Sequence, residues 1–368
     1  MKRRVLFVGR TRYRLPLEPS LARKWEALRE RFDLRVLASA GGPSGGDPTF
    51  RLVPKLPLAD GPLFYALLPF RVARELRELR PDAVIAQSPY EGAACLLALR
   101  LARSRAKLIV EAHGDWETST RLYGSPARRA LAPLGDRIAV AAFRRADATR
   151  ALSGYTAGLL RGLGVEPTAV FPTYSDLTVF SGPPPAPLPD RPQALFVGVL
   201  QDYKNVDGLA AAWRLAAPRV APAVLHVVGR GPRAPVIEAL VRDLPTQTRW
   251  TESLPAPELA AELDASTLLL LPSNAEGLGR VVIEAFLRSR PAIGSRVGGI
   301  PDLIEDGVNG VLVPPGDVDA LAQAIVSLLP DRDRAERMGE AARETAKAWD
   351  STPERFAERM AELVDAAL

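Results

Sequence analysis

Residues Leu268 to Val313 read LLLLPSNAEGLGRVVIEAFLRSRPAIGSRVGGIPDLIEDGVNGVLV, and this stretch decides the fold. Thr267 to Leu271 is a short apolar run without alternation, which is typical of a strand buried on both faces of a parallel sheet. Residues 272–279 are turn-forming types, and the pattern after them predicts a helix from about Arg280 to Ser289. The stretch therefore predicts the strand, turn and helix of an α/β domain.

Two carboxylates, Glu276 and Glu284, flank the glycine turn. The backbone N–H groups of Gly277, Leu278 and Gly279 lie where a helix begins, so they lack intrahelical partners and can bind phosphate or sugar oxygens. The two glycines have no Cβ, which lets such oxygens approach closely. In this interpretation Glu276 accepts hydrogen bonds from sugar hydroxyls and Glu284 from a ribose diol. The alternative is that Glu276 caps the helix and Glu284 is a solvated helix residue.

The longer pattern, EGLGRVVIEAF followed by GGIPDLIEDGVNGVLVPPGD, resembles the donor-binding segment of the family 4 retaining glycosyltransferases, also described as glycosyl transferases group 1. Their signature is a Glu, seven intervening residues and a second Glu, which Glu276 and Glu284 match. The resemblance implies the GT-B fold, two Rossmann-like domains facing an interdomain cleft. It also implies transfer of a hexosyl group from a nucleoside diphosphate sugar with retention at the anomeric carbon. No carboxylate is placed by motif as a nucleophile, so a front-face route is favoured.

Strand and helix patterns alternate twice along the chain, which predicts two α/β domains with doubly wound, mostly parallel sheets. The length of 368 residues suits two domains of roughly 180 residues each. We expect an acceptor-side domain over residues 1–180 and a donor-binding domain over residues 193–350. The proline-rich residues 181–192 are expected to form a stiff linker, and a helix over about 353–368 to cross back onto the first domain. Strands are predicted at 5–8, 34–38, 83–86, 108–112, 148–152 and 169–171, and again at 194–199, 224–229, 267–271 and 291–294.

The segment FVGVLQDYKN is expected at the donor site, because the carboxyl ends of parallel strands gather ligands. Gly198 ends a strand and Lys204 opens the next helix, from where its ammonium can reach a diphosphate. The family commonly has an arginine where this chain has Val199. Loss of that cation weakens stabilisation of the leaving diphosphate, so Arg280 and Arg230 are candidate substitutes.

The segment VVGRGPRAPVIEAL fits the G-x-G-x-x-A dinucleotide fingerprint through Gly229, Gly231 and Ala234. It would follow the second strand of its domain, and no acidic residue about 20 positions later ends a following strand, as a dinucleotide site requires. An NAD site is therefore disfavoured. The same residues resemble the family's glycine-rich loop at the nucleotide pocket, so Gly229 and Gly231 are assigned to the donor site as backbone contacts.

The chain contains two histidines. His226 alternates inside the strand AVLHVVG, which favours a packed core residue. His113 follows the predicted strand of the first domain in EAHGDW, where Gly114 allows close backbone approach. In the family a histidine at this place lies beside the donor sugar and contacts a hydroxyl. The resemblance therefore places His113 with Lys204 and Glu276 as the catalytic group.

No metal ion and no cofactor are expected. The single cysteine, Cys95, lies in an apolar helical pattern and is interpreted as a core residue. Two Asp-x-Asp spacings occur, Asp317 with Asp319 and Asp331 with Asp333, but each begins a predicted helix, where aspartate is the expected cap. The diphosphate would then be neutralised by a lysine, arginines and a helix terminus.

The first half of the chain is basic. Residues 1–180 carry a net charge of +12 and the remainder −7. One interpretation is contact with an anionic acceptor or an anionic membrane surface; the alternative is an arginine-rich proteome. The arginines concerned are Arg10, Arg12 and Arg14 in the first loop, on the acceptor side, and Arg71, Arg74 and Arg77 along one helix.

The expected partners are a nucleotide-sugar donor and a glycan, lipid or small-molecule acceptor. Nucleic acid is not expected, since aromatic content is 6% and no binding motif is present. The apolar runs are shorter than the ~18 residues that span a bilayer, and MKRRVLFVGR is unlike a signal peptide, which predicts a cytoplasmic protein, with the inner membrane face as a peripheral location. A second hypothesis is a nucleotide-sugar-binding GT-B protein with weak or no activity, because of Val199 and the altered first loop. A GT-B epimerase is disfavoured by the carboxylate pair.

Overall fold

The computed structural model describes residues 2–42, 46–54, 60–116 and 130–368. The chain divides into two compact units. The first comprises Met1–Ser175 together with Ser351–Leu368, and the second comprises Asp176–Asp350. The chain thus leaves the first unit after Ser175 and returns to it at Ser351.

The first unit contains a seven-stranded parallel sheet in the order β3-β2-β1-β4-β5-β6-β7. The strand order reverses between β1 and β4, so the loops after these strands lead to opposite sides and leave a crevice at their carboxyl ends. The strands are β1 (Arg3–Tyr13), β2 (Phe32–Ala40), β3 (Phe50–Val53), β4 (Ala83–Ala86), β5 (Lys107–Ala112), β6 (Ala148–Ala151) and β7 (Ala169–Val170).

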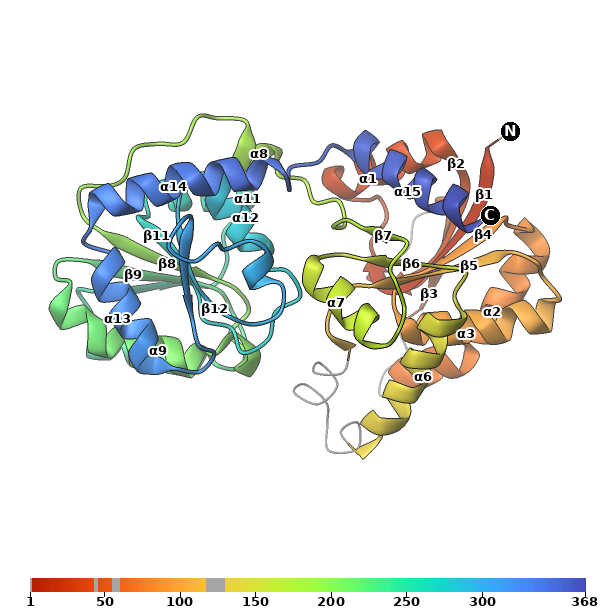
Figure 1. Cartoon of the computed structure of the whole chain (residues 1–368), viewed down its shortest axis with the longest axis horizontal. Coiled ribbons are helices and arrows are strands. Elements are labelled where there is room, and N and C mark those ends of the chain that lie inside the picture. The colour runs from red at the N-terminus through yellow and green to blue at the C-terminus, as the bar shows by residue number, and fades with distance from the viewer. Residues whose placement is uncertain (1, 43–45, 55–59, 117–129) are drawn as a thin grey trace. The chain divides into compact units, whose positions relative to one another are not determined.

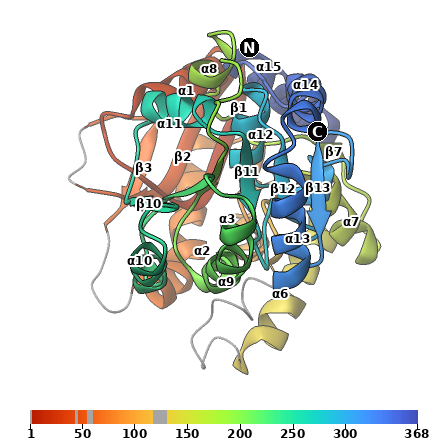
Figure 2. The same cartoon turned by 90° about the vertical axis from the view of Figure 1, so that its left-hand side faces the viewer.

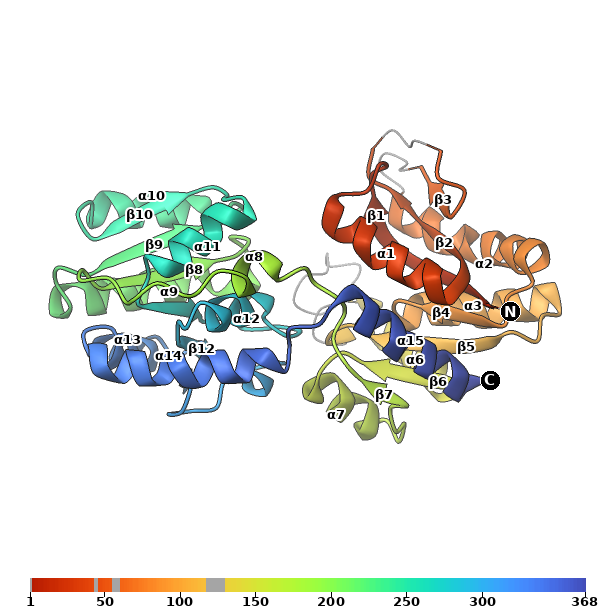
Figure 3. The same ribbon diagram turned by 90° about the horizontal axis from the view of Figure 1, so that it is seen from above.

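Helices cover both faces of this sheet (Figure 1). On one face α1 (Pro19–Arg31) and α15 (Pro353–Ala367) lie side by side, as Figure 3 shows. On the other face lie α2 (Asp60–Leu79), α3 (Pro89–Ala102), α6 (Ala132–Arg145) and α7 (Gly154–Gly162). Among the described residues, no helix combines the length and the apolar character needed to cross a membrane.

The helix α15 is an integral part of the first unit's core. Thr352 caps it by accepting a hydrogen bond from the N–H of Arg355, and a proline occupies its first turn, where a missing N–H costs nothing. Its apolar residues recur at helical spacing and are buried, each by an amount that stabilises the fold by about 1.5–3 kcal/mol. They pack with α1 and the sheet, and they are Phe356, Met360, Leu363 and Val364.

The second unit contains a six-stranded parallel sheet in the order β10-β9-β8-β11-β12-β13. Figure 2 shows β11, β12 and β13 side by side. Here the order reverses between β8 and β11. The apolar run that opened the sequence analysis is β11, and all four of its residues are buried, as expected of a central parallel strand. The strands are β8 (Gln193–Val197), β9 (Val224–Val228), β10 (Thr248–Thr251), β11 (Leu268–Leu271), β12 (Ala292–Ser295) and β13 (Gly310–Val313).

Helices again form a layer on each face of the sheet. One layer holds α9 (Val206–Ala216), α10 (Ala234–Asp243) and α13 (Val318–Leu328). The other holds α8 (Thr178–Ser181), α11 (Ala256–Asp264), α12 (Arg280–Leu287) and α14 (Arg332–Lys347), with α14 packed against α12. Short 3₁₀ turns lie at η1 (Asp202–Lys204), η2 (Ala217–Arg219) and η3 (Ile300–Asp302).

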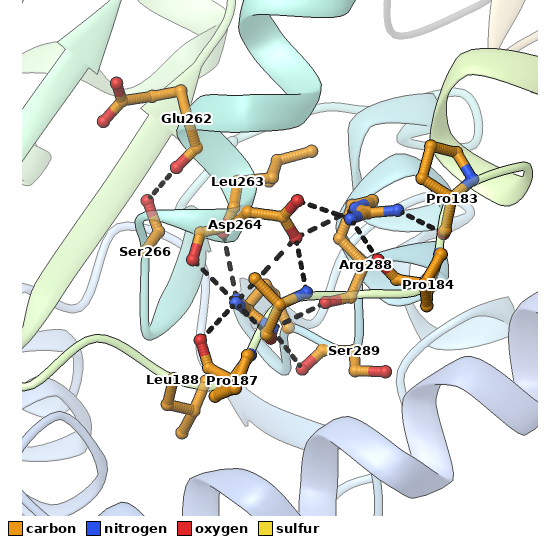
Figure 4. A network of polar contacts seen from close by, with 12 residues as sticks. Pro183, Pro184, Pro187, Leu188, Glu262, Leu263, Asp264, Ser266, Arg288 and Ser289 are labelled. Atoms are coloured by element: carbon orange, nitrogen blue, oxygen red, sulfur yellow. Dashed lines mark hydrogen bonds and ion pairs between the residues drawn. The ribbon is translucent and has the colours of Figure 1, made fainter.

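The proline-rich residues 181–192, expected to be a linker, lie inside the second unit. Two arginines after α12, Arg288 and Arg290, hold them there; their side chains are only 3% and 1% exposed, and both form ion pairs with Asp264. Figure 4 shows Arg288 between Asp264 and the prolines Pro183 and Pro184. Prolines donate no N–H, but their carbonyl oxygens accept hydrogen bonds. The accepting carbonyls are those of Phe180, Pro183 and Pro184 for Arg288, and of Ala186 and Pro187 for Arg290.

Three smaller sequence predictions are confirmed. Cys95 is fully buried in α3. His226 is buried in β9, with its Nδ1 2.7 Å from the Oε1 of Glu262. Asp317 and Asp331 are the N-caps of α13 and α14, and each accepts a hydrogen bond from a backbone N–H of its own helix.

Candidate functional site

The predicted donor-site residues converge at the carboxyl ends of β8 and β11. These two strands pair directly, and the strand order of the second sheet reverses between them. In open α/β sheets this is the place where ligands bind. Lys204 comes from the loop after β8 and Glu276 from the loop after β11, so the two predicted charges lie on either side of the reversal point.

Lys204 and Glu276 form a direct ion pair between Nζ and Oε2. Their side chains are 10% and 15% exposed. Lys204 ends the 3₁₀ turn η1 instead of opening a helix, because Asn205 adopts the left-handed conformation and caps α9. The interpretation of Glu276 as a helix cap is wrong, since the N-cap of α12 is Gly279 and the Glu276 carboxylate is turned to Lys204.

The turn that carries Glu276 requires glycine at several places. Gly279 has φ +85°, in the left-handed region that L side chains rarely adopt. A Cβ at Gly298 would lie 1.8 Å from the carbonyl oxygen of Glu276, and one at Gly299 would lie 2.3 Å from that of Gly277. The N–H of Gly299 donates to the Glu276 carbonyl oxygen at 3.2 Å. Gly298 and Gly299 therefore support the site, although the sequence analysis assigned them no role; the paired glycines of GGIPD were the available signal.

Glu284 lies inside α12 and is 3% exposed, so the interpretation of it as a solvated residue is wrong. Its Oε1 accepts a hydrogen bond from Nε of Arg280 at 2.7 Å, one helical turn away. Burial raises the pKa of the Glu284 carboxyl, and the neighbouring Arg280 opposes that rise. The Arg280 side chain is itself 61% exposed, so the pair extends from the helix interior to the surface.

The glycine loops after β8 and β9 pack backbone against backbone. A Cβ at Gly229 would lie 1.9 Å from the carbonyl oxygen of Gly198. Gly231 has φ +157°, and a Cβ there would lie 2.4 Å from the carbonyl oxygen of Leu200. These close approaches explain the residue type at both positions and bring the predicted glycine-rich loop against the loop that leads to Lys204.

The structure also places the candidate substitutes for the missing arginine. Val199 is 43% exposed. Arg230 is exposed in the adjoining loop, where its carbonyl oxygen accepts a hydrogen bond from the N–H of Leu200 at 3.0 Å. Arg280 is paired with Glu284. Of the two candidate substitutes for the missing arginine, Arg230 lies in the loop next to that of Val199, whereas Arg280 already pairs with the carboxylate of Glu284.

The remaining predicted residues lie in the first unit. His113 directly follows β5, and its Nε2 is 2.7 Å from Oε2 of Glu111. The histidine side chain is 36% exposed, whereas that of Glu111 is 4% exposed and also pairs with Arg150. Sequence reasoning missed Glu111, although a carboxylate inside the apolar run LIVEA was a visible signal.

The arginines of the expected first loop are in part strand residues. β1 continues to Tyr13, with an irregular register against β2 between Val8 and Arg12, so Arg10 and Arg12 belong to the strand. The Arg10 guanidinium lies 6.0 Å from the centre of a tyrosine ring in α2. Arg14 follows the strand and donates from Nε to the carbonyl oxygen of Gly41 at 3.1 Å. The predicted loop at 10–14 is corrected accordingly, and the three arginines lie at the carboxyl edge of the first sheet.

Two family models match successive parts of the chain. Residues 20–179 match the model described as Glycosyltransferase Family 4, and residues 184–345 match the one described as Glycosyl transferases group 1. The chain belongs to the family 4 glycosyltransferases. This confirms the resemblance carried by the two glutamates and the glycine turn. The second match contains all of the donor-site residues grouped around Lys204 and Glu276.

Two curated family 4 relatives are similar over about half of this chain. The sulfoquinovosyl transferase SQD2 of Arabidopsis thaliana is 32% identical over 166 residues, which cover 44% of this chain and 31% of that protein. The GDP-mannose-dependent alpha-(1-6)-phosphatidylinositol monomannoside mannosyltransferase of Mycolicibacterium smegmatis is 33% identical over 183 residues, or 46% of this chain and 48% of that protein. The matches thus span a third to a half of these relatives.

Solved structures share the whole architecture of this family 4 chain. Sucrose-phosphate synthase from Thermosynechococcus elongatus has a TM-score of 0.75 at 21% identity, covering 99% of this chain and 98% of that one. HepE of Anabaena in complex with UDP has a TM-score of 0.72 at 19% identity, covering 100% of both chains. The predicted GT-B class, with two parallel α/β domains, is confirmed.

Proposed function

We propose that this glycosyltransferase is a retaining hexosyltransferase that uses a nucleoside diphosphate sugar. The observation that supports this most is the pairing of Lys204 with Glu276 at the reversal point of the second sheet, beside the glycine turn that opens α12. Lys204 would neutralise the diphosphate, Glu276 would hold the sugar hydroxyls and Glu284 the ribose. Backbone N–H groups of residues 277–279 would bind phosphate or sugar oxygens. HepE, a structural neighbour, was solved with UDP and with UDP-glucose.

The proposed reaction is a front-face substitution at the anomeric carbon. The bond from that carbon to the diphosphate oxygen breaks, and a bond to the acceptor oxygen forms on the same face. The departing phosphate oxygen takes the proton of the acceptor hydroxyl, so the chain itself need not supply a base. Positive charge for the leaving group comes from Lys204, nearby arginines such as Arg230 and the start of α12, and the proposal includes neither a metal ion nor a cofactor.

The alternative proposal is a nucleotide-sugar-binding protein with weak or no transfer. It is favoured by one observation, that an exposed valine, Val199, stands where the family commonly has a cation for the diphosphate. Both proposals predict donor binding. They differ only in whether the bond to the diphosphate is broken.

A donor screen tests the two proposals together. We expect one series among UDP-, GDP-, ADP- and TDP-sugars to raise the melting temperature, because a ligand that binds only the folded state stabilises it. Mass spectrometry of the stabilising mixture should then show free nucleoside diphosphate with hydrolysed or transferred sugar. Stabilisation without turnover would support the alternative, a nucleotide-sugar-binding protein without transfer. The absence of any stabilisation or product would contradict both proposals.

We further propose that the first unit contacts an anionic membrane surface through α2, α3 and α6. α3 packs against both of the other helices. Of the twelve exposed large hydrophobic residues among the described ones, seven lie on these helices or at the N-cap of α6, and Phe70 and Leu131 are 62% and 61% exposed. An arginine-rich proteome explains basic residues but not this gathering of apolar ones. The seven are Leu67, Phe70, Leu97, Leu101, Leu131, Leu134 and Ile138.

Cationic side chains adjoin this apolar surface. An open pocket of about 650 Å³ lies where α2 and α3 end. Arg77 lines this pocket, and its guanidinium donates a hydrogen bond to the backbone carbonyl oxygen of Leu101, one of the seven exposed apolar residues. Basic residues beside exposed apolar ones match a bilayer with anionic headgroups. The charged residues of the pocket wall are Arg77, Arg80, Arg103, Arg105, Lys107 and Asp82.

Vesicle sedimentation tests the membrane contact. We expect the protein to pellet with phosphatidylcholine vesicles that contain phosphatidylglycerol, and far less with pure phosphatidylcholine. The double change Phe70→Ser with Leu134→Ser should weaken this binding about tenfold or more, since each exposed apolar side chain contributes on the order of 1 kcal/mol when it enters the interface. The matched control is Leu215→Ser, because Leu215 is 51% exposed on α9 of the second unit. Equal pelleting with both vesicle types, or an equal loss in the control, would rule the contact out.

A further inference from the structure

The buried carboxylate Glu111 divides its two oxygens between two partners in the first unit. Glu111 lies on β5 directly opposite Arg150 of β6 in the sheet register. Its Oε1 is 2.8 Å from Nη2 of Arg150, and its Oε2 is 2.7 Å from Nε2 of His113. The side chains of Glu111 and Arg150 are 4% and 1% exposed, so this part of the network is closed to solvent.

Glu111 can only accept hydrogen bonds at neutral pH. Burial alone would raise the pKa of its carboxyl, but Arg150, His113 and Lys24 outweigh that effect and lower the pKa to about 2. An ionised carboxylate has no proton to donate. The hydrogen between Glu111 and His113 therefore belongs to Nε2 of the imidazole.

Arg150 keeps Glu111 from turning away. Its guanidinium donates to the carbonyl oxygens of Phe171 and Pro172 and to the hydroxyl of Thr173, each at 3.3 Å. It also stacks over two aromatic rings, with its Cζ 4.6 Å from the centre of Phe171 and 5.7 Å from that of Phe356. Phe356 belongs to α15. The Glu111 carboxylate is thus fixed by the Arg150 guanidinium, which is itself held by three hydrogen bonds and two aromatic rings.

We infer that Glu111 is a positioning residue, which holds His113 as the Nε2–H tautomer and so leaves Nδ1 as the hydrogen-bond acceptor for a hydroxyl of the donor sugar. This rests on the proposed function and on the contact with the donor sugar that the family resemblance implies for His113, but the tautomer follows from the Glu111 contact itself. A neutral imidazole has one donor and one acceptor nitrogen, and the partner of one nitrogen decides the state of the other. Specificity for a hydroxyl that donates to His113 would then originate in a residue that does not touch the sugar.

A purely structural role is the competing account. In it Glu111 serves only to neutralise Arg150, and His113 is a bystander. The two accounts differ in what Glu111→Gln does. The glutamine oxygen should stay on Arg150, which can only donate, and the amide NH₂ then faces Nε2 of His113. That donor requires a lone pair on Nε2, so the imidazole proton should move to Nδ1.

Imidazole nitrogen NMR of the whole chain measures this directly. The chain has only two histidines. The imidazole signals that disappear in His113→Asn therefore belong to His113, and those that remain belong to His226. We expect His113 to be the Nε2–H tautomer in the natural protein and the Nδ1–H tautomer in Glu111→Gln. An unchanged tautomer would overturn the inference. If Glu111→Gln does not fold, Glu111→Leu with Arg150→Met removes the buried pair as a unit, and His113 should then lose its single tautomer.

Kinetics of the donor reaction provide the second readout. Glu111→Gln should lower kcat about tenfold or more while the nucleoside diphosphate Kd changes less than about twofold, since one charge-assisted hydrogen bond is at stake. Glu111→Gln combined with His113→Asn should be no slower than His113→Asn alone, because the two residues act as one unit. Additive losses in the double variant would contradict the inference.

The matched control is Glu75→Gln. Glu75 is another buried carboxylate of the first unit, 2.5 Å from Nη1 of Arg35, and its side chain is 8% exposed. Its replacement should leave both the His113 tautomer and kcat unchanged. If the unmutated protein neither transfers sugar nor hydrolyses the donor, the proposed function is wrong. The NMR measurement of the His113 tautomer would still test the role of Glu111, so the two failures are distinguishable.

Discussion

Glu276→Ala is expected to lower the rate of sugar transfer by at least about 10²–10³-fold while nucleoside diphosphate binding stays measurable. The change removes the acceptor proposed for the sugar hydroxyls. It also releases the Lys204 ammonium from its ion pair, so that cation becomes more available to the diphosphate. Nucleotide affinity should therefore be unchanged or higher, and the loss should appear in kcat. Transfer measured by mass spectrometry and nucleotide binding measured by calorimetry check the two parts separately.

The matched control for this variant is Glu258→Ala. Glu258 lies in the first turn of α11 in the same unit and is exposed. This variant should transfer sugar at the natural rate, because α11 follows the edge strand β10, which β9 separates from the strand reversal at β8 and β11. Full activity of Glu276→Ala would refute the assignment of Glu276, and loss of nucleotide binding with an intact fold would show that Glu276 serves the nucleotide instead of the sugar.

Asp264→Ala is expected to lower the free energy of unfolding of the second unit by about 3–5 kcal/mol, because it leaves two buried guanidinium groups without their carboxylate. Arg288 donates from Nε to Oδ1 of Asp264 at 3.0 Å, and Arg290 lies 3.9 Å from the same oxygen. The N–H of Ala186 also donates to Oδ1, at 3.3 Å, so the proline-rich segment loses a contact as well. Urea unfolding followed by tryptophan fluorescence measures the change.

Asp243→Ala is the control for that measurement. Asp243 is likewise the last residue of its helix, α10, and pairs with Arg214 at 2.7 Å, but both side chains are about half exposed. A surface pair of this kind contributes about 0–1 kcal/mol. If Asp264→Ala cost no more than Asp243→Ala, the buried arginines would not depend on Asp264 as the contacts indicate.

The sequence predicted the central strands and the edge strand β7, but it missed the other three edge strands. β4 and β11 are buried on both faces and read as continuous apolar runs. The missed strands β3, β10 and β13 lie at sheet edges. In β3 and β10, FRLV and TRWT carry charged or polar residues that interrupt an apolar run, whereas GVLV of β13 is apolar and this reason does not explain why it was missed. The extension of β1 to Tyr13 was missed because RTRY has no apolar pattern.

Motifs predicted which loops carry the candidate site residues, but they did not predict the contacts that the fold makes between these residues. Lys204 and Glu276 could each be assigned to a loop at the carboxyl end of a strand, but their ion pair joins residues 72 positions apart. The contact between Glu111 and Arg150 depends on the register of two neighbouring strands. The prolines of residues 181–192 predicted a stiff extended linker, but nothing local to them shows that Arg288 and Arg290 supply the donors that hold this segment in the second unit.

The discontinuous first unit also sets an order of events during synthesis. The second unit is contiguous from Asp176 to Asp350, so all of it is synthesised before α15 is translated. Until then the nascent first unit has a bare apolar surface around Trp25 and Phe171, where Phe356 later packs. A nonsense or frameshift mutation directly after codon 350 would therefore destabilise the first unit, which is synthesised first, and leave the sequence of the second unit intact.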